Sequence, residues 1–167
     1  MTIEFFSPKG PHGFLSNFYE AVFEIEDRQW ITVEHFFQAS KAATPEERQR
    51  IADAGGPGLA KKLGRACQMR QDWETSVGTK HLHDIFRDDQ GVVVELVKDH
   101  YMFAALVAKF TQRHDLTAAL RSTGDQLLVE ASPYDYYWGT GKDGSGQNKL
   151  GRMLCLVRKR LPEATDS

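Results

Sequence analysis

The stretch YDYYWGTGKDGSGQNKLGR, residues 134–152, decides the fold class of this chain. Its glycines at 139, 141 and 144 match the G-x-G-x-x-G pattern of dinucleotide-binding folds. That pattern holds a pyrophosphate only when a strand precedes it and a βαβ unit surrounds it. The residues after Gly144 are too few for a crossover helix, a second strand and a ribose-binding acid. The dinucleotide-binding interpretation therefore fails on length, and the glycines are interpreted as part of a loop that forms a pocket.

Helical spacing of apolar residues dominates the chain before this loop and begins at Thr32. A second helix is expected after Thr44, whose hydroxyl can cap it, with Pro45 at its first position and Glu47 completing a capping box. The glycine-rich residues 55–58 end that helix. Further helices are expected at about 59–65, 92–110, 114–121 and 147–161. In the last of them, the residues expected to face the core are Leu150, Met153, Leu154 and Val157.

The N-terminal part predicts a small β element. Residues 3–8 and 21–30 alternate partly between apolar and polar side chains, which is typical of short strands, and Gly10, Pro11 and Gly13 mark a turn between them. No alternating βαβ units follow. The predicted class is mainly α, or α+β at most: a compact helical domain with a small N-terminal β element. A chain of 167 residues suits one domain, expected over 1–161, with a disordered tail at 162–167.

The composition is that of an ordinary globular protein, with 41% hydrophobic and 26% charged residues. A formal net charge of -2 argues against a surface that coats nucleic acid. The two cysteines, Cys67 and Cys155, have no ligand-like spacing, so neither a disulfide framework nor a structural zinc site is expected. The chain shows no secretion signal and no apolar run of about 18 residues. The expected location is the cytoplasm, with no membrane partner.

The helix TVEHFFQASK, residues 32–41, carries the first candidate site. Glu34, Gln38 and Lys41 form one polar stripe along it, roughly opposite the apolar face. The stripe spans about two turns, which is enough to bind a ribose-sized group. The alternative is a solvated helix face. His35 has no second metal ligand at helical spacing and is expected to cap or pack.

The aromatic cluster around Asp135 is the second candidate. Tyr134, Tyr136, Tyr137 and Trp138 flank this carboxylate, restrict water around it and offer faces on which a planar base can stack. The alternative is an aromatic corner that fills the core while Asp135 caps a turn. Both interpretations remain open at this point.

Basic residues follow the glycine loop and suggest an anion site at the start of the last helix, near Gln147 and Asn148. Glycines let backbone amides approach an anion closely. The basic residues are Lys142, Lys149, Arg152, Arg158, Lys159 and Arg160. Solvated charge on a terminal helix is the alternative for the last three.

Two further segments are ambiguous by themselves. Ser16 and Asn17 lie between Phe14 and Phe18, which suits a turn that presents amides beside a hydrophobic wall, although this segment alone favours a plain structural turn. Trp73 is either a core residue or a stacking surface.

Taken together, these segments resemble the NADAR family of YbiA-like N-glycosidases. The resemblance rests on GFLSNFYEAVFEIEDRQWITVEHFFQASK (13–41), on LGR with RQDWE (63–74), and on LLVEASPYDYYWGTGKDGSGQNKLGRMLCLVR (127–158). Members of that family are compact, largely helical proteins that hydrolyse N-glycosidic bonds of ribosylated compounds. The implied substrates are phosphorylated ribosylamino-pyrimidine intermediates of riboflavin biosynthesis or, alternatively, ADP-ribose attached to guanine bases of nucleic acid. A non-catalytic sensor of ADP-ribose or a nucleotide is the alternative of another class.

The resemblance implies site residues position by position. The acid of the family's helix motif falls on Glu34, the lysine that ends it on Lys41, the tryptophan of the R-x-x-W-E block on Trp73, and the acid before Y-W-G on Asp135. Other motif positions expected at the pocket are Asn17, Phe18, Trp138, Gly139, Asn148 and Arg152. One departure is an apparent insertion at about 78–92, which either forms a surface flap or reshapes the pocket mouth near Trp73.

The hypothesis places Asp135 beside the anomeric carbon, where a carboxylate stabilises the positive charge that develops as the C1′–N bond breaks. Glu34 then orients water or the ribose hydroxyls, and the two acids can exchange roles. Lys41 and Arg152 are expected to neutralise a phosphate or the leaving group, and Trp73 and Trp138 to enclose the base. The hydrolysis needs no metal and no redox cofactor.

Overall fold

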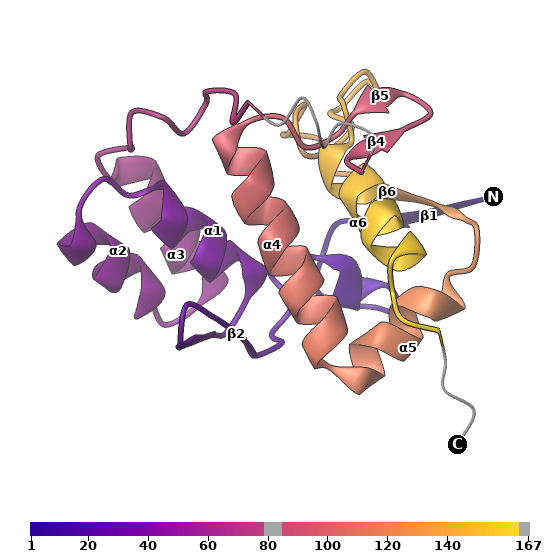
Figure 1. Cartoon of the computed structure of the whole chain (residues 1–167), viewed down its shortest axis with the longest axis horizontal. Coiled ribbons are helices and arrows are strands. Elements are labelled where there is room, and N and C mark those ends of the chain that lie inside the picture. Colours follow the sequence, from indigo (N-terminus) through magenta and orange to yellow (C-terminus); the bar gives the residue numbers. More distant parts are fainter. Residues whose placement is uncertain (79–84, 164–167) are drawn as a thin grey trace.

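The computed structural model describes residues 1–78 and 85–163, and the remainder of the predicted insertion and tail (79–84 and 164–167) lies outside the described residues. It has an α+β fold in which helices predominate. The helices are α1 (Val33–Lys41), α2 (Pro45–Ala52), α3 (Pro57–Ala66), α4 (Val97–Gln112), α5 (His114–Ser122) and α6 (Lys149–Lys159). Helix α4 runs between the α1–α3 group on one side and α6 on the other (Figure 1). The predicted class is confirmed.

The strands form three two-stranded ladders within the described residues. Strand β1 (Thr2–Phe5) pairs in parallel with β6 (Leu127–Glu130), and a hairpin joins β2 (Phe23–Ile25) to β3 (Arg28–Trp30). A second hairpin joins β4 (Arg87–Asp88) to β5 (Gly91–Val92), and a short 3-10 turn, η1, covers Gly13–Leu15. The fold therefore brings the N-terminus beside a strand that lies more than a hundred residues later.

Several strand predictions need correction. The strand expected at 3–8 covers Thr2–Phe5, and the strands β4 and β5 were not expected in the apparent insertion. The single strand expected at 21–30 is a hairpin, because Glu26 and Asp27 both have φ 57, the left-handed conformation of a two-residue hairpin turn. Strand β6 was not predicted at all. Its four residues carry little periodicity of their own, and their pairing with β1 depends on contacts that are distant in sequence.

Helix α1 packs against α2, α3 and α4, and every residue from Val33 to Ser40 is buried. The solvated helix face considered for its polar stripe is therefore wrong for Glu34 and Gln38. Thr32 caps the helix by accepting the amide of His35 at 3.2 Å. The His35 ring lies 2.7 Å from the Thr32 hydroxyl and 3.0 Å from the carbonyl oxygen of Ala54, which confirms the predicted packing role.

The predicted ends of the later helices lie within about two residues of those observed, except that α4 begins at Val97 and not at about 92, because Gly91–Val92 form β5. Thr44 accepts the amide of Glu47 at 3.3 Å and Pro45 opens α2. The four apolar residues of α6 predicted to face inward are buried. Helix α6 lies directly against β6, where a Cβ added to Gly151 would be 2.0 Å from the carbonyl oxygen of Leu128. None of the described helices is long and apolar enough to cross a bilayer.

Lys109 of α4 is an unusual member of the core, because its side chain is completely buried. Its Nζ donates to the carbonyl oxygen of Ser16 at 3.0 Å and lies 5.5 Å from the ring centre of Tyr19. Burial lowers the pKa of Lys109 from 10.5 to about 7. This ammonium group ties α4 to the turn at residues 16–17.

Replacing Lys109 with Met is expected to change how stability depends on pH. Between pH 7 and 10.5 the unfolded wild-type chain binds a proton at Lys109 that the folded protein releases, so wild-type stability rises with pH in this window. Lys109→Met removes that rise, which is at most about 1.4 kcal/mol per pH unit. Urea unfolding at pH 7, 8, 9 and 10 measures the effect. The exposed Lys159→Met variant should keep the wild-type slope; an unchanged slope in Lys109→Met would contradict the assignment.

Candidate active site

A cavity of about 800 Å³ opens between α1, α3 and the loop that follows β6. Its size is in the range of small-molecule sites. Its lining combines several kinds of group. The carboxyl groups are Glu34, Glu130 and Asp135, the cations are Lys61 and Arg65, the amides are Asn17 and Gln38, and the aromatic rings include Phe6, Phe18, Phe37, Tyr134 and Trp138. Acids from distant parts of the chain thus meet at one apolar-walled hollow.

Glu34 enters the cavity from the first turn of α1. Its amide donates to the carbonyl oxygen of Asn17 at 3.1 Å, and its carboxyl accepts from the side-chain amide of Gln38 at 2.8 Å. The residue is only 6% exposed. Burial raises the pKa of Glu34, and the Asp135 charge adds to this, while the Gln38 hydrogen bond, Lys61 and Arg65 oppose it. The protonated form is favoured more than in water, so Glu34 is suited to bind hydroxyl groups.

Asp135 both caps a turn and lines the cavity, so each interpretation weighed for it describes part of its environment. Its Oδ1 accepts the amides of Tyr137 at 2.9 Å and Trp138 at 2.7 Å. These bonds hold the carboxyl in place and position the neighbouring indole. The Trp138 ring meets Phe37 edge-to-face at 5.4 Å between ring centres. The result is a fixed acid beside an aromatic wall.

Glu130, the last residue of β6, is a cavity acid that sequence reasoning missed. Its amide donates to the side-chain oxygen of Asn148 at 2.9 Å, and its carbonyl accepts the amide of Thr140 at 3.0 Å. Gly139 lies close by: a Cβ there would be 3.2 Å from the Glu130 Cγ. Burial raises the pKa of Glu130 to about 8, with a further contribution from the charge of Asp135. In the sequence, its place five residues before Asp135 was the feature that could have indicated a second acid near the same site.

Lys61 and Arg65 were also missed, and they stand one turn apart on α3 at the cavity. Gly64 allows α3 to approach α1 closely, since a Cβ at this position would lie 2.0 Å from the Oε1 of Gln38. The Lys61 Nζ lies 5.7 Å from the ring centre of Phe18. The spacing of the two cations on one helix was visible in the sequence, but nothing there paired α3 with Glu34.

Two of the expected catalytic positions are not part of the cavity lining. Trp73 is buried behind the wall, with its ring 5.2 Å from Phe37 and 5.6 Å from Tyr101. Lys41 ends α1, where its carbonyl oxygen accepts the amide of Arg70 at 2.9 Å. The stripe on α1 therefore contributes Glu34 and Gln38 to the cavity, while Lys41 lies beyond it.

Residues expected to form an anion site at the start of α6 are bound to other parts of the chain. The Arg152 guanidinium binds Asp88 of β4 through two hydrogen bonds of 2.7 and 2.6 Å, so its charge is already paired. Asn148 adopts a left-handed conformation with φ 50, and its side chain binds the main chain of Leu128 and Glu130. Gly139 packs against Glu130 without lining the cavity. Gly139, Asn148 and Arg152 are thus held by contacts within the chain and are not among the residues that line the cavity.

The described part of the apparent insertion lies over α6, where Figure 1 shows the β4–β5 hairpin beside the helix. Phe86 packs edge-to-face against Phe103 at 5.5 Å, and Asp88 pairs with Arg152. None of the residues 85–92 belongs to the cavity lining. The insertion was expected either to form a surface flap or to reshape the pocket mouth near Trp73. Residues 85–92 match the surface flap. Residues 79–84 lie outside the described part of the chain.

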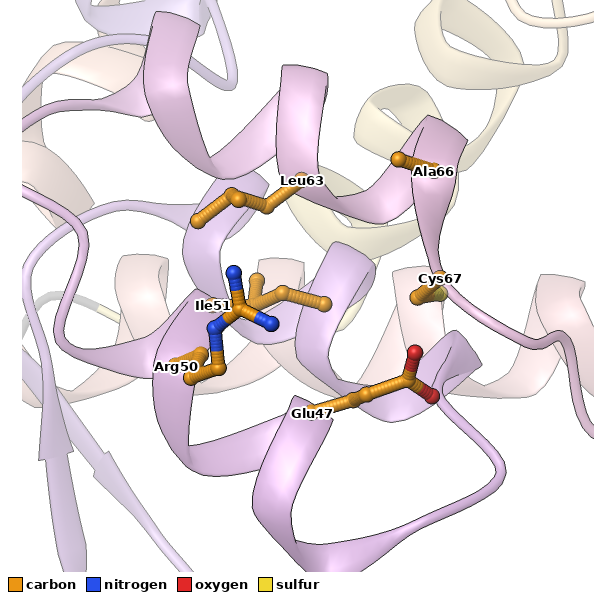
Figure 2. Close-up of a pocket in the computed structure, with 6 residues that line it drawn as sticks. All are labelled: Glu47, Arg50, Ile51, Leu63, Ala66 and Cys67. Atoms are coloured by element: carbon orange, nitrogen blue, oxygen red, sulfur yellow. The ribbon is translucent and has the colours of Figure 1, made fainter.

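A smaller hollow of about 60 Å³ lies between α2 and α3 (Figure 2). The Glu47 carboxyl, which Figure 2 shows directed towards Cys67, already accepts the amide of Gln68 at 3.2 Å. Burial raises the pKa of the Cys67 thiol, which disfavours the reactive thiolate. This hollow is too small for a nucleotide and lacks the paired acids of the larger cavity.

An α+β fold whose main cavity gathers three carboxyl groups and two cations defines a protein equipped for acid–base chemistry on a small ligand. The model of the NADAR domain matches residues 4–162, and the chain belongs to the NADAR family. It is 36% identical to the N-glycosidase Npun_R5314 of Nostoc punctiforme, over 96% of this chain and 93% of the relative. It is 33% identical to the riboflavin biosynthesis protein VVA0006 of Vibrio vulnificus, over 96% of this chain and 39% of that protein.

The fold has a solved counterpart in the NMR structure of the Escherichia coli protein YbiA. The TM-score is 0.76 at 32% identity, and the match covers 95% of this chain and 83% of that one. The expected YbiA-like fold and the resemblance to the NADAR family are confirmed. The names of the relatives agree with the expected enzyme class, a hydrolase acting on N-glycosidic bonds.

Proposed function

We propose that this protein hydrolyses the ribosyl C1′–N bond of phosphorylated ribosylamino-pyrimidine intermediates of riboflavin biosynthesis. The observation that carries the proposal is the meeting of Glu34, Glu130 and Asp135 with Lys61 and Arg65 in one cavity. The acids suit cleavage of a glycosidic bond and the cations suit a phosphate. The names of its relatives, N-glycosidase and riboflavin biosynthesis protein, support the same reaction and pathway.

The surroundings of each cavity residue suit it to a different role in the reaction. Asp135, held by two backbone amides, stands beside the anomeric carbon, stabilises the oxocarbenium-like charge and takes a proton from the attacking water. Glu34 is more deeply buried and binds the ribose hydroxyls together with Gln38. Trp138 and Phe37 form the apolar wall against the base. Lys61 and Arg65 take the phosphate-binding role first expected of Lys41 and Arg152.

Incubation of the purified protein with a ribosylamino-pyrimidine 5′-phosphate tests the proposal. The expected result is release of ribose 5-phosphate and the free aminopyrimidine, both followed by chromatography. A parallel incubation with an oligonucleotide that carries ADP-ribose on guanine separates the two substrate classes. Turnover of the oligonucleotide alone would reject the metabolite, and tight binding without turnover of either compound would favour a sensor.

Lys61→Met is expected to weaken binding of the phosphorylated substrate. Loss of one charge-assisted contact raises KM about tenfold or more, and kcat changes little because the phosphate is remote from the bond that breaks. The exposed neighbour Lys62 provides the matched control as Lys62→Met. Steady-state kinetics on the phosphorylated compound and its dephosphorylated form measure the effect. An equal rise in KM for both compounds would show that Lys61 does not bind the phosphate.

One observation favours the second candidate substrate, ADP-ribose attached to guanine. Tyr134 is 85% exposed and Phe6 is 50% exposed, although both lie at the cavity. Exposed rings beside a nucleotide-sized cavity offer stacking faces for an additional base. Tyr134→Ala should therefore reduce binding of the ADP-ribosylated oligonucleotide if this is the substrate, and leave the ribosylamino-pyrimidine phosphate unaffected.

A further inference from the structure

Glu130 is a third cavity acid that the roles above leave unused. It ends β6, where its main chain is held by the side chain of Asn148 and by Thr140, and where Phe5 of β1 lies opposite it in the ladder. Its side chain lies in the cavity and is 8% exposed as a residue. The neighbouring Gly139 has no Cβ, which leaves room for the Glu130 side chain. The fold thus holds a carboxyl group rigidly at the wall that also carries Asp135.

The groups around Glu130 disfavour a negative charge on it. Burial is the largest influence, and the charges of Asp135 from the following loop and Glu34 from α1 act in the same direction. Lys61 of α3 and the amide of Ser132 oppose them. The pKa of Glu130 is raised to about 8, so its carboxyl group holds a proton at neutral pH. On the α6 side, Lys149 is paired with Asp99 and Arg152 with Asp88.

We propose that Glu130 is the catalytic acid that protonates the leaving nitrogen. As the C1′–N bond breaks, its electron pair goes to nitrogen, which takes the proton of the Glu130 carboxyl. The oxygen of water bonds to C1′ and its proton goes to Asp135. Exchange with solvent then returns a proton to Glu130 and removes one from Asp135, so the enzyme is unchanged. This assignment rests on the proposed function, because an amine is a poor leaving group unless it is protonated.

Glu130→Gln tests the assignment because glutamine keeps the size of the side chain and has no acidic proton. The variant is compared with wild type on two compounds that both carry a phosphate on C5 of the ribose: a ribosylamino-pyrimidine 5′-phosphate and 4-nitrophenyl 5-phospho-β-D-ribofuranoside. The first leaving group needs a proton and the nitrophenolate does not. The expected loss in kcat is about 10²–10⁴-fold on the first compound and less than about tenfold on the second. A residue with only a structural role would impair both equally.

The pH profile gives a second readout. Wild-type kcat/KM on the amine substrate is expected to fall as pH rises through about 8, because the acid loses its proton, and Glu130→Gln should lack this fall. Glu4→Gln, an exposed acid on β1, is the matched control and should behave as wild type. Equal losses on both compounds, or an alkaline fall retained in Glu130→Gln, would overturn the role of Glu130 alone. A wild-type protein that cleaves neither compound would instead overturn the proposed function, and the role of Glu130 with it.

Discussion

Asp135→Asn is expected to reduce kcat on the ribosylated substrate by about 10²–10⁴-fold, which is the range for loss of a catalytic acid–base or charge-stabilising group. Asparagine keeps an oxygen where Oδ1 accepts the amides of Tyr137 and Trp138, so the turn should persist. The variant loses the negative charge that stabilises the sugar cation and the site that receives the proton from water. Ground-state binding should change little, because these interactions strengthen only as the C1′–N bond breaks.

Single-turnover kinetics measures the rate of bond cleavage, ligand titration measures ground-state binding, and thermal unfolding measures whether the turn and the fold persist. Asp143→Asn is the matched control, because Asp143 lies in the same glycine loop and binds Ser145 at the surface. That variant should retain wild-type kcat. Wild-type rates in Asp135→Asn would remove Asp135 from the mechanism, and a lowered unfolding midpoint would assign the defect to the turn.

The second large effect is expected for Lys149→Met, which breaks a buried ion pair next to Tyr137 of the aromatic cluster. The Lys149 Nζ lies 2.9 Å from Asp99, whose side chain has no exposed surface. Asp99 also accepts the Tyr137 hydroxyl at 2.6 Å and the amide of Leu96 at 3.0 Å. Removing the cation leaves a buried carboxylate without its partner. The expected loss in the free energy of unfolding is about 3–5 kcal/mol.

Urea unfolding measures this loss, and a second substitution tests its cause. Lys149→Met combined with Asp99→Asn removes both charges and should recover part of the lost stability, because the two sites are coupled. The exposed Lys142→Met variant serves as the control and should change stability by less than about 0.5 kcal/mol. A loss below about 1 kcal/mol in Lys149→Met, or strictly additive effects in the double variant, would contradict a coupled buried pair.

Local signals in the sequence determined the helices. Thr44 caps α2 as expected, and Thr32 caps α1 at the residue where helical spacing begins, since a capping hydroxyl bonds to an amide only three residues away. The apolar spacing in α6 correctly identified its buried side. The number of residues after Gly144 argued against a dinucleotide-binding domain, and the described residues after the glycine loop form helix α6 with no further strand. The family motifs, read along the chain, also selected Glu34 and Asp135, which share one cavity.

Only the tertiary structure decided which charged groups are available to a ligand. Arg152 follows the glycine loop and looked free, yet Asp88, 64 residues away in sequence, pairs with it. Lys61 and Arg65 lie at the cavity because Gly64 lets α3 approach Gln38 of α1. Glu130 became a site residue because the pairing of β6 with β1 and the loop after β6 place it beside Asp135. Caps and helical faces are set within a few residues, whereas charge pairing and burial depend on partners that folding brings together.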